Sequence, residues 1–296
     1  MKLKLVFAFL AVFLLFTTSR AFAADPDPNF FIFLCFGQSN MEGYPGIPAD
    51  YKDLSKYDHR FQLLAAVDFP TLNRKKNQWY DAVPPLCRSD SGVCPVDFFG
   101  RTLVDNLPKN IKVGVINVAV AGCKIEMFDK ANFQAYASTQ QSWMTNIVKL
   151  YDGNPYQKLV DLGKLAQKDG VIKGILLHQG ESNSGEGAKW AAKVKGVYDN
   201  LCKDLDLKPE KTPLLAGELT NSGGASMLAE LPKALPNSFV IPSKGCGTAN
   251  SLHFSPAGYK ELGTRYGTKM CELLGYPIKD AASQPATTPA TTPAAK

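Results

Sequence analysis

The sequence lacks the residue patterns that mark several large classes of function. It has 296 residues, a formal net charge of +6 and no run rich in lysine or arginine, so a nucleic-acid partner is not indicated. It contains no Cys-x-x-Cys pair and no His-Glu-x-x-His, the spacings typical of zinc sites. The glycines within residues 180–187 are not followed by Gly-Lys-Ser or Gly-Lys-Thr, which argues against a phosphate-binding loop.

A long apolar run occurs only at the N-terminus. Residues 1–4 are basic, residues 5–16 are apolar, and Ala21-Phe22-Ala23 has the small residues of a cleavage site. We therefore expect residues 1–23 to be a secretory signal peptide whose removal lowers the formal net charge to +3. Its apolar part is too short for a permanent membrane span, so we predict a secreted protein, extracellular or periplasmic, without such a span.

The two ends of the remaining chain differ in composition. Residues 281–296 contain mainly alanine, threonine and proline and are predicted to form a flexible tail or linker. Residues 24–280 form a body of about 257 residues, which is long enough to bury the core of an α/β enzyme.

Strand and helix patterns alternate along this body. We expect strands over five apolar stretches, at residues 29–35, 111–120, 171–177, 213–216 and 239–241. Helical patterns follow at residues 95–108, 154–169, 188–205, 225–235 and 256–274, whereas residues 43–94 have no sustained period. This alternation predicts an α/β fold with a mostly parallel, five-stranded sheet covered by helices on both faces.

Residues with catalytic chemistry follow four of the predicted strands. Ser39 follows the first strand, Gly122 the second, Gln179 and Glu181 the third, and His253 lies in the loop after the fifth. In parallel sheets ligands bind beyond the carboxyl ends of the strands, so these residues are expected to converge.

This set of residue types suits a nucleophilic serine mechanism. Ser39 is the candidate nucleophile, His253 the candidate base, and the N–H groups of Ser39 and Gly122 with the Gln179 amide are candidate oxyanion donors. Two of these residues also have a simpler alternative role: Ser39 could cap a turn, and Gly122 could serve only as a turn residue after a strand.

Four segments resemble the conserved blocks of a known family. They are Phe36-Gly37-Gln38-Ser39-Asn40-Met41-Glu42-Gly43, Ala121-Gly122, His178-Gln179-Gly180-Glu181 and Leu252-His253-Phe254. They resemble carbohydrate esterase family 6, the acetylxylan and sialate O-acetylesterase relatives within the SGNH hydrolase superfamily. The resemblance implies a flavodoxin-like, three-layer α/β/α sandwich and deacetylation without metal or cofactor. It also implies the roles given above for Ser39, His253 and the oxyanion donors.

The sequence departs from this family at one position. The family usually has aspartate three residues before the histidine, and this chain has Asn250. Some relatives use the glutamate of the third block, here Glu181, as the acidic partner. We favour Glu181 as the third catalytic residue, with Asn250 as the alternative.

The resemblance implies a secreted esterase that removes acetyl groups from a polysaccharide, which we expect to be xylan. The alternatives are a sialate O-acetylesterase and a catalytically vestigial carbohydrate-binding module on the same fold. We expect a monomer, and we expect residues 43–94 to form a wall of the site. Trp79 and Tyr80 are candidate sugar-stacking residues there, although they could equally pack this segment down.

The seven cysteines of an exported chain leave at least one thiol unpaired. Cys87 and Cys94 flank a small polar loop and are predicted to form a disulfide. A pairing of Cys123 with Cys246 is a weaker expectation. Cys35 lies within a predicted core strand and is expected to be a buried free thiol.

Overall fold

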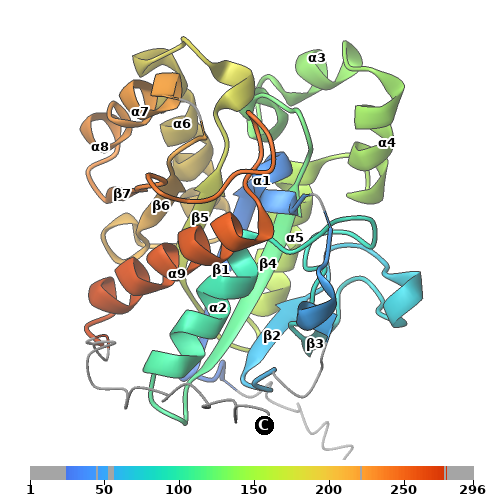
Figure 1. The fold of residues 1–296 in the computed structure, drawn as a ribbon, viewed down its shortest axis with the longest axis vertical. Coiled ribbons are helices and arrows are strands. Elements are labelled where there is room, and N and C mark those ends of the chain that lie inside the picture. The colour runs from blue at the N-terminus through green and yellow to red at the C-terminus, as the bar shows by residue number, and fades with distance from the viewer. Residues whose placement is uncertain (1–24, 45, 53–56, 221, 277, 279–296) are drawn as a thin grey trace, which may run out of the picture.

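The computed structural model describes residues 25–44, 46–52, 57–220, 222–276 and 278 (Figure 1). The predicted signal peptide and the predicted C-terminal tail therefore lie outside the described residues. The structure is a central sheet of seven strands with helices on both faces, in the order β3-β2-β4-β1-β5-β6-β7 (Figure 1). This arrangement confirms the predicted three-layer α/β/α sandwich.

The centre of the sheet consists of three long parallel strands, β1 (Phe30–Gly37), β4 (Lys112–Ala119) and β5 (Val171–His178). All eight residues of β1 are buried, because helices cover both of its faces and β4 and β5 cover both of its edges. The strands β6 (Leu214–Gly217) and β7 (Ser238–Ile241) continue the parallel sheet beyond β5. All five predicted strands are present.

Two further strands lie in the region that we expected to be irregular. The strand β2 (Phe61–Leu64) pairs in parallel with β4, and β3 (Trp79–Asp81) pairs antiparallel with β2 at the edge. The prediction of five strands was therefore too low. Strands of four and three residues are too short to show a periodic pattern, and the pairing of β2 with β4 and of β3 with β2 stabilises them instead.

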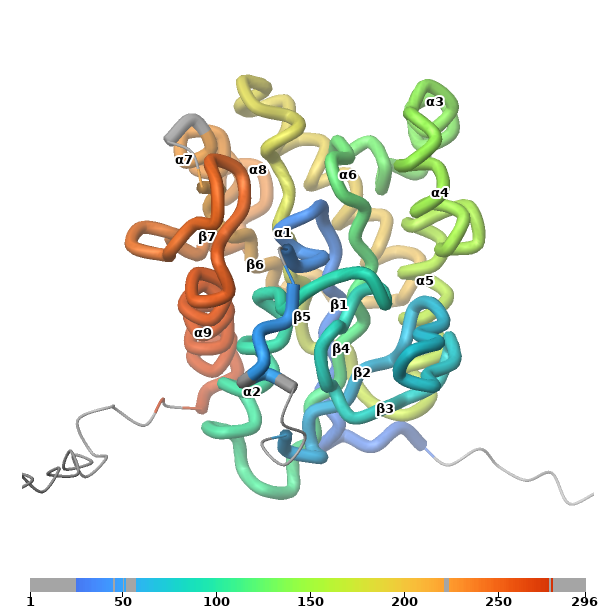
Figure 2. Tube along the Cα trace, turned by 45° about the vertical axis from the view of Figure 1, so that its right-hand side comes forward, coloured from blue at the N-terminus to red at the C-terminus, as the bar shows by residue number. Residues whose placement is uncertain are grey.

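The helices divide between the two faces of the sheet. Figures 1 and 2 show α2 (Pro95–Asn106) and α9 (Pro256–Leu273) side by side on one face. On the other face lie α5 (Pro155–Ala166) and α6 (Ala188–Asp204) (Figure 2). The predicted helix at residues 225–235 is instead two short helices, α7 (Ser222–Leu228) and α8 (Leu231–Ala234). Pro232 can occupy the first turn of α8, but it cannot continue α7.

Short elements occupy the carboxyl end of the sheet. The four-residue helix α1 (Ser39–Glu42) follows β1, and α3 (Phe133–Ser138) and α4 (Ser142–Leu150) stand at the same end (Figure 1). Five 3₁₀ turns complete the described elements: Ala49–Lys52, Pro70–Leu72, Ile125–Phe128, Glu181–Asn183 and Pro209–Lys211. In the described part of the chain, no helix is both long and apolar enough to cross a membrane.

The chain order of the central strands determines where a ligand can bind. The chain passes from β1 to β4 on one side and then returns to β5 on the other side, so β1 is the topological switch point. The last residues of β4 and β5, Ala119 and His178, both align with Gly37 at the end of β1. The loops that leave these three strands therefore begin at the same level.

All seven cysteines are buried free thiols, so both predicted disulfides are contradicted. The Cys87 thiol lies 3.2 Å from the hydroxyl of Tyr151. The Cys94 thiol instead faces the Asn117 side-chain amide, at 3.8 Å. The polar loop between Cys87 and Cys94 thus leads each thiol into a different part of the core. The expectation that Cys35 is a buried free thiol is confirmed.

This arrangement predicts the behaviour of the thiols in solution. Burial raises the pKa of Cys87 to about 11, and only the thiolate form reacts rapidly with thiol reagents. We expect slow labelling of the native protein by a chromogenic disulfide reagent and all seven thiols to react in denaturant without reductant. Five reactive thiols in denaturant, or a melting temperature lowered by dithiothreitol, would show that a disulfide forms.

Candidate active site

Ser39 is the first residue of α1 and lies just beyond the end of β1. The chain can turn there because Gly37 has no side chain: a Cβ at Gly37 would lie 2.1 Å from the carbonyl oxygen of His178. Ser39 Oγ lies 3.0 Å from His253 Nε2. The two residues are 214 positions apart in the chain, so the fold brings them together as the sequence predicted.

His253 lies in the loop before α9, and the side chain of Asn250 in the same loop holds it in place. Asn250 Oδ1 accepts hydrogen bonds from the backbone N–H groups of Leu252 and His253, each at 2.9 Å. The same oxygen lies 3.2 Å from His253 Nδ1. Because an oxygen faces Nδ1, the ring proton is favoured on Nδ1, and the lone pair of Nε2 then faces the Ser39 hydroxyl.

The far end of this loop is fixed by the start of α9. Ser255 is the N-cap residue, and its hydroxyl accepts from the N–H of Gly258 at 3.2 Å. Pro256 occupies the first turn, where its missing N–H costs no hydrogen bond. The loop is therefore held by a turn on one side and by a helix cap on the other.

Asn40, which the sequence analysis did not single out, ties the histidine loop to α1. Its side-chain N–H groups donate to Glu181 Oε1 at 2.6 Å and to the carbonyl of Leu252 at 2.9 Å. Its side-chain oxygen accepts from the N–H of Phe254 at 3.3 Å and from the hydroxyl of Tyr259 at 2.9 Å. The two residues that flank His253 are thus bound to the residue that follows Ser39.

Glu181 lies near the dyad but does not contact His253. Its side chain is 6% exposed, and Oε1 lies 2.6 Å from Asn40 Nδ2 and 3.4 Å from His178 Nε2. Burial by itself raises the pKa of Glu181, but the hydrogen bonds and charge contributed chiefly by His178 outweigh it, so the pKa lies below its usual range. Among the residues described, Asn250 rather than Glu181 is hydrogen-bonded to the ring, which is the opposite of the sequence-based preference.

The environment of His253 affects its basicity. Burial lowers the pKa of His253, and the negative charge of Glu181 opposes this effect. The imidazole therefore remains neutral, and able to accept a proton, at a lower pH than an exposed histidine would.

Two backbone N–H groups at this position have no acceptor among the residues that the structure describes. They belong to Ser39, at the start of α1, and to Gly122, in the turn after β4. Gly122 adopts a φ of +66°, a conformation that suits glycine. Both residues line one cavity of about 290 Å³, together with Gln38, Ala121, Glu181, Ser182, Leu252 and His253.

Gln179 does not join these donors. Its side-chain nitrogen donates to Asn183 Oδ1 at 2.7 Å and lies 3.3 Å from Gln38 Oε1 and from the carbonyl of Cys123. Its oxygen accepts from the indole N–H of Trp190 at 2.7 Å. The amide is buried and its N–H groups have acceptors within the protein, so the predicted oxyanion role does not agree with this geometry.

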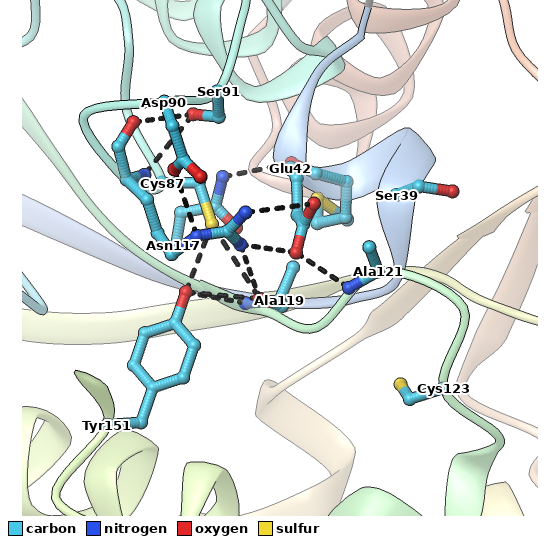
Figure 3. A network of polar contacts seen from close by, with 12 residues as sticks. Ser39, Glu42, Cys87, Asp90, Ser91, Asn117, Ala119, Ala121, Cys123 and Tyr151 are labelled. Atoms are coloured by element: carbon cyan, nitrogen blue, oxygen red, sulfur yellow. Dashed lines mark hydrogen bonds and ion pairs between the residues drawn. The ribbon is translucent and has the colours of Figure 1, made fainter. Parts of the chain in front are cut away.

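A buried ion pair supports the turn that carries Gly122 (Figure 3). Glu42, at the end of α1, pairs with Arg88, and both side chains are almost completely buried. Glu42 Oε1 also accepts from the N–H of Ala121 at 2.6 Å. Burial raises the pKa of Glu42, which the charge and hydrogen bonds of Arg88 oppose. Figure 3 shows the Ser39 hydroxyl directed away from this network, so Glu42 acts on the site through Ala121.

The two predicted sugar-stacking residues lie elsewhere. Trp79 packs against Phe30, at the start of β1, with ring centroids 4.8 Å apart, and its indole N–H donates to Asp169 at 2.9 Å. The Tyr80 hydroxyl binds its own loop, through the N–H of Lys75 at 2.8 Å. Phe30 begins β1, whereas Ser39 follows its other end. Neither Trp79 nor Tyr80 lines this cavity.

The cavity also has no ready-made metal site within the described part of the chain. No three side chains of histidine, cysteine, aspartate or glutamate lie together there in a way that could hold an ion. A serine hydroxyl paired with an imidazole, beside free backbone N–H groups, is the arrangement that serine hydrolases share.

Comparison with known proteins places the chain in a family. The chain belongs to the family described as "carbohydrate esterase, sialic acid-specific acetylesterase", whose model matches residues 29–272. The carbohydrate-esterase part of the expected resemblance is therefore confirmed.

Similar solved structures share the fold at low sequence identity. A protein from Arabidopsis thaliana has 20% identity and a TM-score of 0.61, over 83% of this chain and 99% of that chain. NanS has 15% identity and a TM-score of 0.59, over 85% and 99% of the two chains. XAC1771, a carbohydrate acetylesterase from Xanthomonas citri, has 17% identity and a TM-score of 0.58, over 82% of this chain and 56% of that chain.

The Glu42–Arg88 pair leads to a stability prediction. Arg88→Ala leaves a buried carboxylate without its partner, and breaking a buried pair in this way costs about 3–5 kcal/mol. We expect urea unfolding to show this loss in the free energy of unfolding. The control is Lys195→Ala, which breaks an exposed pair with Asp199 and should cost no more than about 1 kcal/mol. Equal losses in the two variants would contradict the importance of the buried pair.

Proposed function

We propose that this protein is a serine O-acetylesterase that acts on an acetylated carbohydrate. The observation that carries the proposal is the 3.0 Å contact between Ser39 Oγ and His253 Nε2 inside the 290 Å³ cavity of a carbohydrate esterase family member. A vestigial binding module would need no such contact, so the geometry favours an active enzyme over that alternative.

The residues of the site supply each step of ester hydrolysis. Ser39 Oγ attacks the acetyl carbonyl carbon while its proton passes to His253 Nε2. The N–H groups of Ser39 and Gly122 stabilise the negative charge that develops on the carbonyl oxygen. The proton on Nε2 then passes to the departing sugar oxygen, leaving an acetyl-enzyme. Water, deprotonated by His253, hydrolyses this ester and releases acetate and free Ser39.

Asn250 and Glu181 divide the role that one aspartate has in a Ser-His-Asp triad. Asn250 orients the ring, because two backbone N–H groups keep its oxygen directed at Nδ1. It offers no charge to the imidazolium that forms during the reaction. Glu181 carries that charge nearby, held by Asn40, and acts on His253 through space.

The composition of the cavity favours an uncharged sugar. None of the described residues that line it is lysine or arginine, and Glu181 contributes a carboxylate. A sialic acid carries its own carboxylate, which this lining would not attract. An acetylated neutral polysaccharide such as acetylxylan is therefore the proposed substrate. The description of the family favours an O-acetylated sialic acid as the second candidate.

We also propose that the enzyme is secreted. The proposal rests on the sequence of residues 1–23, which combines a basic start, an apolar run and a small-residue cleavage site.

Acetate release tests the reaction and the substrate together. We expect the wild type to release acetate from acetylated xylan faster than from O-acetylated sialic acid, and Ser39→Ala to lose at least about 10³-fold in kcat, since no nucleophile remains. Faster release from the sialic acid would make the second candidate correct. Undiminished turnover by Ser39→Ala would remove the serine mechanism.

The missing charge at position 250 predicts a gain of function. In Asn250→Asp a carboxylate replaces the amide oxygen next to Nδ1, and a partly exposed ion pair of this kind is worth about 1 kcal/mol, or roughly a fivefold gain in kcat. Because burial lowers the pKa of His253, we expect the acid limb of the wild-type pH–rate profile to lie at lower pH than for an ordinary histidine. In Asn250→Asp the pKa of His253 should rise, and the acid limb should move to higher pH.

Glu181→Gln tests the other half of this division. It removes the through-space charge, so we expect a lower kcat and an acid limb displaced to lower pH. If Asn250→Asp leaves both kcat and the pH profile unchanged while Glu181→Gln abolishes activity, Glu181 alone provides the acidic function.

A further inference from the structure

Exposed apolar side chains gather around Ser39. The described residues include six large hydrophobic side chains that are exposed: Tyr44, Leu72, Trp143, Leu150, Leu252 and Leu273. Leu252 lines the cavity that holds Ser39, Tyr44 contacts His253, and Trp143 contacts Gly122. Half of the set therefore lies beside one small site. Leaving such side chains in water is unfavourable, so a cluster of this kind calls for a partner.

Trp143 stands on the Gly122 side of the cavity. It belongs to α4, and its indole N–H donates to Gln141 Oε1 at 2.8 Å, which fixes the orientation of the ring. The edge of the indole approaches Gly122 so closely that a Cβ there would lie 3.0 Å from Trp143 Cη2. The side chain nevertheless remains 47% exposed. Trp143 is thus a held but uncovered aromatic surface next to a proposed oxyanion donor.

Tyr44 stands on the His253 side of the cavity. It follows Gly43, the residue at the end of α1, and its ring centroid lies 4.8 Å from that of the His253 imidazole, with the planes tilted by 43°. The residue is 48% exposed, so contact with the imidazole covers only part of it. Both aromatic residues therefore lie beside a residue that lines the cavity, Tyr44 beside His253 and Trp143 beside Gly122.

An uncharged sugar ring is the ligand that suits these surfaces. Its C–H groups form an apolar face, and its hydroxyls point to the sides and remain in water. Aromatic side chains provide large, rigid contact area at little cost in conformational entropy. An acetyl group enters the cavity of about 290 Å³ that Ser39, Gly122 and His253 line. The ring that bears it then remains outside, and the exposed aromatic surfaces beside His253 and Gly122 are available to it.

We propose that Tyr44 and Trp143 form the two walls of a subsite for the uncharged sugar ring that carries the acetyl ester. This inference rests on the proposed function and adds the residues that recognise the carbohydrate. It also replaces Trp79 and Tyr80, which belong to the edge strand β3 and contact Phe30 and Lys75 instead. Leu252, in the loop of His253, adds an exposed apolar side chain to the lining of the cavity.

The test compares a substrate that has a sugar ring with one that lacks it. The probes are chemically acetylated xylotetraose and p-nitrophenyl acetate. For Trp143→Ala and Tyr44→Ala we expect kcat/KM on the acetylated oligosaccharide to fall about tenfold further than on the aryl ester, mainly through KM. Trp143→Phe and Tyr44→Phe should recover most of this loss, because they keep an aromatic face.

Leu150→Ala is the matched control. Leu150 lies on the same helix as Trp143 and is 49% exposed, but it lines a different cavity, with Val67 and Asp152. We expect it to leave both activities unchanged. Equal losses on the two esters in Trp143→Ala and Tyr44→Ala would overturn the proposal, because they would show that the rings only support Gly122 and His253. A selective loss on O-acetylated sialic acid, with none on the acetylated oligosaccharide, would overturn the uncharged ligand.

Binding without turnover separates this proposal from the proposed function. If the wild type hydrolyses neither ester, the esterase proposal fails, and calorimetric titration with acetylated xylotetraose still tests the subsite. In the Ser39→Ala background we expect Trp143→Ala to weaken binding about tenfold and Leu150→Ala to leave it unchanged. Equal binding by all three proteins would overturn the subsite.

Discussion

The buried side chain of Asn40 is the contact on which the site depends. Ser39 and His253 come from opposite ends of the chain, and only their own hydrogen bond joins them directly. Asn40 binds the carbonyl of Leu252 and the N–H of Phe254, so the loop is held on both sides of the histidine. Both interactions need one group that donates and accepts at once. An aspartate could not donate, and a leucine could do neither. The same amide orients Glu181, so position and charge are set together.

Much of the fold could be predicted because the central strands are buried on both faces. Strands buried in this way consist of uninterrupted apolar runs, such as residues 30–36, and such runs can be recognised in the sequence alone. The short strands β2 and β3 could not be predicted, because their positions depend on the pairing of β2 with β4 and of β3 with β2 rather than on a pattern of their own. The free thiols were missed for a similar reason: spacing along a loop does not reveal into which part of the core each side chain turns.

The site was predictable at the level of loops and not at the level of side-chain direction. The predicted parallel strands indicated where the loops of Ser39 and His253 lie, because the carboxyl ends of such strands meet at one edge of the sheet. The direction of Gln179 follows from Asn183 and Trp190, which lie on later elements and attract its amide inward. The pairing of His253 with Asn250 follows from a local turn, in which backbone N–H groups hold the amide oxygen in place. No spacing rule distinguishes that turn from a contact with Glu181.

The proposed catalytic residues and the proposed sugar-binding residues differ in how strongly their surroundings constrain them. Ser39 and Gly122 follow central strands, and His253 lies in the loop before α9. Buried contacts such as those of Asn40 and Glu42 hold these segments and leave little freedom for change. Tyr44 follows α1 and Trp143 lies on α4, and about half of the surface of each is exposed to solvent. Replacing a half-exposed side chain costs little folding free energy. Under the proposed mechanism, the same nucleophile and base therefore serve different sugars when only these outer side chains change, without any rearrangement of the sheet that holds Ser39 and His253.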